Sequence, residues 1–135
     1  MANALFDKGR EGFLDGSLDW DTQLIKLIIV DHTDDTPVPA TDEDLADIVA
    51  GARVDTSGAF AGKTVTAGVA DATDVTLTAV TGDAADSIVI YFDSTVEATS
   101  RLIAFIDTAT GLPVTPNGGD ITIAWDAGAN KIFKL

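Results

Sequence analysis

The sequence predicts a mainly β protein, an antiparallel β-sandwich of jelly-roll type with about eight strands and one or two short helices. Two observations carry this prediction. Residues 88–92 and 102–106 are short runs of β-branched, aromatic and aliphatic residues joined by a polar span, the pattern of two strands and their connection. Elsewhere, short Thr-rich runs are separated by glycine, proline and asparagine, which favour turns.

The runs at residues 88–92 and 102–106 are expected to form the centre of the fold. Neither run alternates between apolar and polar residues, and residues 24–30 do not alternate either. Strands with one wet face do alternate, so both faces of these strands should be covered. We expect the cover to come from the N-terminal arm and a helix over residues 42–50, or from a neighbouring chain.

The N-terminal residues 1–16 are predicted to be an arm or short helix that precedes a single β-sandwich domain over residues 17–135. Asn3 is the expected N-cap and Gly16 the expected end of such a helix. Two internal glycines each weaken a helix by about 1 kcal/mol relative to Ala. The helix must therefore be held by packing, or the segment is irregular. The apolar residues on one side of the helix would be Leu5, Phe6 and Phe13.

Later segments complete the predicted order of elements. Thr41 is a typical N-cap for the helix over residues 42–50, because three acidic residues follow it in the first turn and Gly51 supplies the end. Beyond this helix the periodicity changes to two, which indicates strands. The chain is expected to close with a hairpin in which residues 121–125 pair with residues 131–135.

Composition excludes several classes of partner. The chain of 135 residues has 22 acidic and 8 basic residues, a formal net charge of −14, and no cysteine. Such acidity disfavours nucleic acid, whose binding depends on Lys and Arg. The absence of cysteine excludes disulfides, thiolate metal sites and thiol nucleophiles. Apolar runs are far shorter than the roughly 20 residues that span a bilayer, and no export signal is visible. We expect a soluble protein with no membrane partner.

The charges are unevenly distributed. Residues 31–47 contain seven acidic residues and no Lys or Arg. Lys8 and Arg10 lie near one end of the chain, and Lys131 and Lys134 near the other. If the two ends meet in the fold, they form the least acidic patch on the molecule.

No catalytic site and no cofactor are predicted. His32 is the only histidine and lies in an acidic loop, where it is expected to be solvated. Ser17 lies in the sequence Asp-Gly-Ser-Leu-Asp, which is not the Gly-x-Ser-x-Gly of a hydrolase nucleophile. No glycine-rich loop of the phosphate-binding kind is present.

Paired acidic residues on turns offer the hard oxygens that calcium prefers, but none follows the order of an EF-hand with its closing glutamate. Ordinary turn chemistry, in which Asp bonds its own backbone, is the preferred interpretation, and no metal site is predicted. The acidic pairs and triads are Asp31, Asp34 and Asp35; Asp71 and Asp74; and Asp83 and Asp86.

Three blocks of the sequence resemble a widespread family of small virion proteins of tailed bacteriophages. The blocks are MANALFDKGREGFLDGSLDWDT at residues 1–22, Gly-Ala-Arg-Val at residues 51–54, and SRLIAFIDTATGLPVTPNGGDITIAWDAGANKIFKL at residues 100–135. Residues 31–50 and 93–99 are the least typical. These blocks indicate kinship, and they contain no motif that specifies a reaction.

The resemblance implies a non-enzymatic virion structural protein, a capsid cement or decoration protein on the outer face of the phage head. Such a protein binds the major capsid protein, bridges and stabilises its subunits, and associates with itself as a dimer or trimer. It would be made in the host cytoplasm and end on the outer surface of the capsid. A tail or neck component of the same virion is the first alternative. A carbohydrate-binding module is the second, with Trp20, Tyr91 and Trp125 as stacking residues.

Contacts of a cement protein are expected where the two ends of the chain supply aromatic and basic side chains, since aromatic residues and Arg anchor interfaces disproportionately. The alternative for these residues is packing within their own chain. The predicted contact residues are Leu5, Phe6, Arg10, Phe13, Trp20, Lys131, Phe133 and Lys134.

Overall fold

The computed structural model describes residues 2–135, and this part of the chain contains ten antiparallel strands and one α-helix. The prediction of a mainly β protein is therefore confirmed. The strands are β1 (Ala4–Leu5), β2 (Ile25–Val30), β3 (Arg53–Thr56), β4 (Thr64–Thr66), β5 (Val69–Asp71), β6 (Val75–Leu77), β7 (Ser87–Phe92), β8 (Leu102–Ile106), β9 (Ile121–Ile123) and β10 (Phe133–Lys134), and the helix is α1 (Asp7–Asp15).

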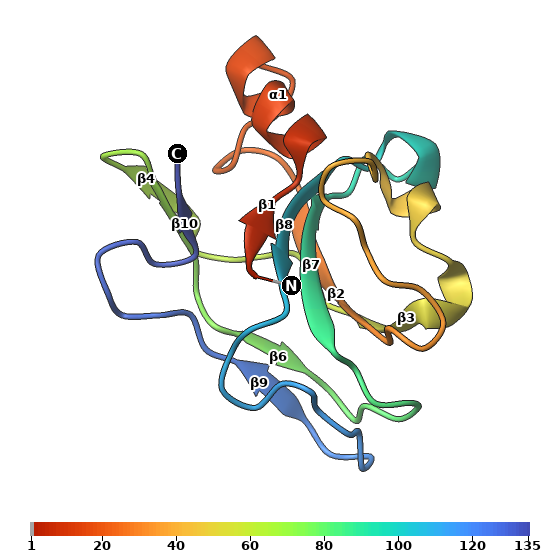
Figure 1. The fold of residues 1–135 in the computed structure, drawn as a ribbon. Helices are drawn as coiled ribbons and strands as arrows, with labels where there is room; N and C mark the ends of the chain where they lie inside the picture. Colours follow the sequence, from red (N-terminus) through yellow and green to blue (C-terminus); the bar gives the residue numbers. More distant parts are fainter. Residues whose placement is uncertain (1) are drawn as a thin grey trace.

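A five-stranded sheet in the order β1-β8-β7-β2-β3 forms the middle of the molecule (Figure 1). β7 pairs with β8 and with β2, and all three strands are almost entirely buried. The predicted central position of residues 88–92 and 102–106 is thus confirmed. The other strands form a three-stranded sheet, β10-β5-β4, and the pair β6-β9.

Both faces of the five-stranded sheet are buried by the same chain. The two small sheets lie on one side of it, and the segment of residues 31–52 lies on the other (Figure 1). We call the second side the covered face. Its buried residues are Phe6, Ile28, Val30, Leu45, Ile48, Ala52, Val89, Tyr91, Leu102 and Phe105. Cover from within the chain, the first of the two expected sources, accounts for the uninterrupted apolar strands.

The helix α1 begins later than predicted. Asn3 is not its N-cap: Phe6 holds that position with an extended backbone, and Asn3 precedes the short strand β1. The helix ends at Gly16, as predicted, with φ of 82°. Phe6 and Phe13 do not share one side of the molecule, because Phe6 packs edge-on against Phe105 and Phe13 packs against Phe133.

Packing holds this helix despite its glycines. A Cβ atom on Gly9 would lie 2.7 Å from the backbone oxygen of Leu102 and 3.0 Å from the Cα atom of Ile103. Only glycine therefore lets the helix backbone approach β8 so closely. The same part of β8 is irregular, since Ile90 faces Ala104 while Tyr91 faces Leu102. The extra residue sends Leu102 to the covered face and Ile103 to the other face.

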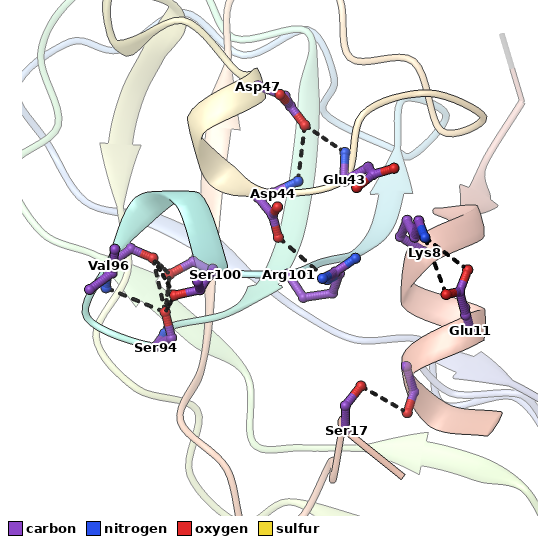
Figure 2. A network of polar contacts seen from close by, with 12 residues as sticks. Lys8, Glu11, Ser17, Glu43, Asp44, Asp47, Ser94, Val96, Ser100 and Arg101 are labelled. Atoms are coloured by element: carbon purple, nitrogen blue, oxygen red, sulfur yellow. Dashed lines mark hydrogen bonds and ion pairs between the residues drawn. The ribbon is translucent and has the colours of Figure 1, made fainter. Parts of the chain in front are cut away.

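The helix predicted over residues 42–50 does not form. Two 3₁₀ turns, Leu45–Asp47 and Ala50–Ala52, take its place. Tertiary hydrogen bonds prevail over the local helical preference: Leu45 N–H donates to the Ser100 oxygen, and Leu102 N–H donates to the Glu43 oxygen. Figure 2 shows the Asp47 carboxylate accepting from the backbone N–H groups of Glu43 and Asp44.

Arg53 holds these turns over the sheet. Its guanidinium donates to the backbone oxygens of Leu45 and Ile48 at 2.6–2.9 Å and pairs with Glu97 at 2.8 Å. The carbonyl groups that a helix end would leave open are satisfied in this way. Arg53 thereby gives a structural role to the Gly-Ala-Arg-Val block.

The prediction of a closing hairpin is also wrong. β9 pairs with β6, and β10 pairs with β5, so residues 121–125 and 131–135 belong to different sheets. The long-range partners β5 and β6 decide this arrangement, and a local turn signal carries no information about them.

Candidate functional site

A groove of about 720 Å³ lies where the two ends of the chain meet, between the β1 edge of the five-stranded sheet and the segment that leads into β10. We call it the terminal groove. It is lined by Asn3, Ala4, Leu5, Arg10, Ile88, Ala104, Phe105, Ile106, Thr108, Ala109, Thr110, Ile123, Ala124, Trp125, Asp126, Lys131, Ile132, Phe133 and Lys134.

Asn3 fixes the N-terminal wall of the groove. Its Oδ1 atom accepts hydrogen bonds from the backbone N–H groups of Asp107 at 3.0 Å and Thr108 at 2.9 Å, and its Nδ2 atom donates to the Thr108 oxygen at 3.0 Å. These bonds close β1 onto the end of β8. Asn3 was expected at a helix terminus. Its observed role depends on the pairing of β1 with β8, which the sequence pattern does not show.

The C-terminal wall is fixed by contacts with loops beside the small sheets and by the pairing of β10 with β5. Trp125 donates from its backbone N–H to the Asp74 carboxylate at 3.0 Å and from its indole to the Thr73 oxygen at 3.2 Å. Its ring packs against Phe60 at 5.6 Å between centroids. β10 is anchored to β5 through the pair Phe133 and Ala70. Two strands that each end a sheet, β1 and β10, thus border one groove.

The charge of the terminal groove is opposite to that of the molecule. Three of the 8 basic residues of the chain line it, whereas only one of the 22 acidic residues, Asp126, does so. Lys131 and Lys134 form no ion pair with any residue of the described part, 2–135, and Arg10 makes only an exposed contact of 3.9 Å with Asp7. The prediction that meeting termini would form the least acidic patch fits this arrangement.

The other five basic residues are occupied within the chain. Lys8 pairs with Glu11, Lys26 with Asp93, Arg53 with Glu97 and Arg101 with Asp44, and Lys63 donates to the Gln23 oxygen. The basic residues therefore divide into a set that stabilises the fold and a set of three that faces the terminal groove.

Five of the predicted contact residues line the terminal groove and the other three do not, although Phe13 and Trp20 both pack against Phe133. Phe6 is completely buried in the covered face, and Trp20 is 4% exposed, with its indole donating to the Asp71 oxygen at 3.0 Å. For these two, packing within their own chain is the observed role, and they leave the set of candidate contacts. Phe13 is half-buried against Phe133. The five that line the terminal groove are Leu5, Arg10, Lys131, Phe133 and Lys134.

A second hollow, of about 470 Å³, lies on the other side of Phe133. Phe13, Trp20 and Val65 contribute to its lining, and Val65 is 54% exposed. Two acidic residues, Asp19 and Asp21, and no basic residue line it. It therefore lacks the basic character of the terminal groove.

The histidine is not the solvated loop residue that was expected. His32 is half-buried, its Nε2 atom lies 2.8 Å from the Ser87 hydroxyl, and its ring stacks on Phe105. Ser87 is fully buried, and within residues 2–135 no carboxylate contacts the other ring nitrogen of His32. The pair lacks both an orienting acid and a path for substrate to the hydroxyl, so it does not match a Ser-His-Asp arrangement.

The carboxylates on the acidic turns mostly accept hydrogen bonds from backbone N–H groups. Asp35 accepts from the N–H of Val49 at 2.8 Å, and Asp86 accepts from that of His32 at 2.9 Å. Carboxylate oxygens of Asp31, Asp34 and Asp83 lie within 4.8 Å of one another. Asp31 is buried and accepts from the Thr33 N–H at 2.7 Å, which is turn chemistry of the expected kind.

Two acidic residues beside the 3₁₀ turns have shifted pKa values. Burial raises the pKa of Asp42 and that of Asp44, and neighbouring carboxylates add to both shifts. The Arg101 guanidinium, 3.4 Å from Asp44, opposes the second shift. On this side of the molecule acidic residues lie beside turns that cover the sheet, whereas basic residues line the terminal groove.

Comparison with known proteins returns no family model and no curated sequence that matches this chain. Among residues 2–135, no helix has the length and apolar character needed to cross a membrane.

Proposed function

We propose that this protein is a non-enzymatic structural protein of a bacteriophage virion, a cement protein that binds the outer face of the head and bridges major capsid subunits. The terminal groove is the observation that supports a binding role. It gathers five predicted contact residues in one place and leaves three basic side chains unoccupied by strong intramolecular pairs. The virion and the capsid enter through the resemblance of three sequence blocks to tailed-phage virion proteins.

In this role, the contribution to function is interface area rather than chemistry. Aromatic and basic side chains at the groove are of the types that anchor interfaces. The net charge of −14 keeps the rest of the surface from nonspecific contact with nucleic acid, as suits a protein on the outside of a head. Self-association as a dimer or trimer would place several grooves on one capsid site and increase avidity.

Immunogold labelling of intact virions with an antibody against this protein tests the proposal. Label distributed over the head is the expected result. Label confined to the tail or neck would replace the cement role with that of a tail or neck component. Virions without label would contradict any role on the virion surface.

The jelly-roll form of the sandwich is part of the proposal. We take the two small sheets together as the second layer, because residues of β5 and β6 bury against the same face of the five-stranded sheet. An experimental structure in which these two sheets pack on opposite faces would contradict this assignment.

The carbohydrate-binding alternative has little support in the geometry. Trp20 and Tyr91 are 4% and 3% exposed, so neither offers a ring face for stacking on a sugar. Trp125 is half-buried and leans on Phe60. A glycan array without hits is the expected result.

A further inference from the structure

We propose that the terminal groove binds an extended, acidic peptide segment of a partner protein, which adds as a strand to the free edge of β1. This inference rests on the proposed function, because it specifies the partner segment that the groove accepts. It is argued from hydrogen-bonding geometry, apolar lining and charge.

The edge of β1 is available for a further strand. Phe6 N–H donates to the Ile103 oxygen at 2.9 Å, while Leu5 stands opposite Ala104. In an antiparallel pair, residues alternate between facing the neighbouring strand and facing away from it with their N–H and C=O groups. The backbone groups of Leu5 therefore point away from β8, toward the open side of the sheet.

The opposite border of the groove is a sheet edge as well. β10 is the last strand of the order β10-β5-β4, and Phe133 and Lys134 line the groove. An extended chain that enters between β1 and β10 meets unpaired backbone on the β1 side and the side chains of β10 on the other. Strand addition of this kind supplies affinity through main-chain hydrogen bonds and specificity through alternate side chains.

The lining separates into apolar and basic parts, as recognition of an alternating segment requires. Leu5, Ile106 and Ile123 offer apolar surface to one set of side chains. Arg10, Lys131 and Lys134 offer positive charge to the other set. Since Asp126 is the only acidic residue of the lining, a segment with Asp or Glu at alternate positions is favoured over a neutral or basic one.

Nucleic acid shares the negative charge of this segment, but it fits the groove less well. The apolar side chains of the lining make no favourable contacts with a phosphate backbone. The acidic remainder of the surface repels a polyanion that extends beyond the groove. A short acidic peptide has neither problem.

The test is selection from a random peptide library with the full chain as bait, followed by binding measurements on the selected peptides by fluorescence anisotropy. We expect peptides rich in Asp and Glu, with binding that weakens as salt is added. Lys134→Glu should weaken binding at least about tenfold, equivalent to about 1.4 kcal/mol. Lys8→Glu is the matched control, because it makes the same change of charge outside the groove.

Two further measurements test the strand geometry and the class of ligand. N-methylation of alternate backbone nitrogens in a selected peptide should abolish binding in one of the two registers. Single-stranded oligothymidylate should not displace the peptide. Circular dichroism establishes that both protein variants are folded, and Lys131→Gln provides a milder change if Lys134→Glu is not.

The proposal is overturned if no peptide is selected or if the selected peptides are neutral or basic. It is also overturned if Lys8→Glu and Lys134→Glu weaken binding equally. On the side of strand geometry and ligand class, it fails if N-methylation in both registers has no effect or if the oligonucleotide displaces the peptide. Such a failure leaves the virion labelling result intact. Label on the head without peptide binding would refute this inference alone, whereas peptide binding without label would refute the proposed function alone.

Discussion

The covered face and the terminal groove flank the same five-stranded sheet but are built in opposite ways. On the covered face, Phe6 and the 3₁₀ turns cover the apolar strands, and Arg53 holds the turns in place with three short hydrogen bonds to their backbone and one to Glu97. At the terminal groove six apolar side chains are only half-buried, and the basic residues beside them make no strong ion pair. The six are Leu5, Ile106, Ile123, Trp125, Ile132 and Phe133. The difference separates surface that stabilises the fold from surface that is available to a partner.

The largest expected effect is on the covered face, at Phe6. Phe6→Ala removes a completely buried ring that packs against Phe105, so it should lower the free energy of unfolding by about 3–5 kcal/mol. Leu14→Ala is the control from the same helical region, because Leu14 is 89% exposed, and it should change the free energy by less than about 0.5 kcal/mol. Urea unfolding measures both, and equal effects would contradict the assignment of Phe6 to the core.

Alkaline pH tests how well the covered face excludes water. Burial, reinforced by the Asp93 carboxylate, raises the pKa of Tyr91 to about 12. In the unfolded chain this pKa is about 10, so the unfolded state loses the proton first and stability falls as pH rises above 10. The loss reaches about 2 kcal/mol by pH 12 and levels off just under about 3 kcal/mol at higher pH.

Tyr91 is the only tyrosine, so the near-ultraviolet absorbance of phenolate reports its titration directly. Tyr91→Phe should remove most of the alkaline decline in stability, which separates this effect from the titration of lysines. Ionisation of Tyr91 near pH 10 in the folded protein would show that water reaches the covered face.

A smaller effect is expected at Arg53, which ties the cover to the sheet. Arg53→Ala leaves the backbone oxygens of Leu45 and Ile48 without their charged donor and should lower the free energy of unfolding by about 2 kcal/mol. Arg53→Lys should recover only part of this loss, since Lys lacks the planar fork. Full recovery by Lys would indicate that charge rather than geometry holds the turns.

The smallest effects are expected at the terminal groove. Lys131→Ala and Lys134→Ala should each change the free energy of unfolding by less than about 0.5 kcal/mol, because neither lysine has an ion pair within the described residues. Thermal unfolding measures both. A loss above about 1 kcal/mol would show that the lysine stabilises the fold, and the contrast between the two regions would fail.

The sequence pattern predicted well those elements whose formation does not depend on which distant segment they pair with. Residues 88–92 and 102–106 are so apolar that any fold must bury them, and they lie in the centre of the sheet. The end of α1 at Gly16 was also predictable, because a glycine suits the left-handed backbone found there. Both signals are local.

The errors arise where distant segments compete with local preference. Residues 42–50 have a good helical pattern, but Leu45 and Glu43 form backbone hydrogen bonds with Ser100 and Leu102 in place of the bonds of a continuous helix. The C-terminal hairpin has a good turn signal, but β9 and β10 pair with β6 and β5 instead. Asn3 has the side chain of an N-cap, and it closes β1 onto β8.

The mainly β class, the central strands and the acidic character of the chain follow from composition and from periods of a few residues, so they could be predicted without coordinates. Which aromatic residues are buried, and which basic residues remain without a strong ion pair, depends on contacts between distant segments. Phe6 and Leu5 are neighbours in the chain, yet one is buried under the cover and the other borders the terminal groove. Strand pairing sends their side chains to opposite faces, and that pairing is a long-range contact between residues about a hundred positions apart.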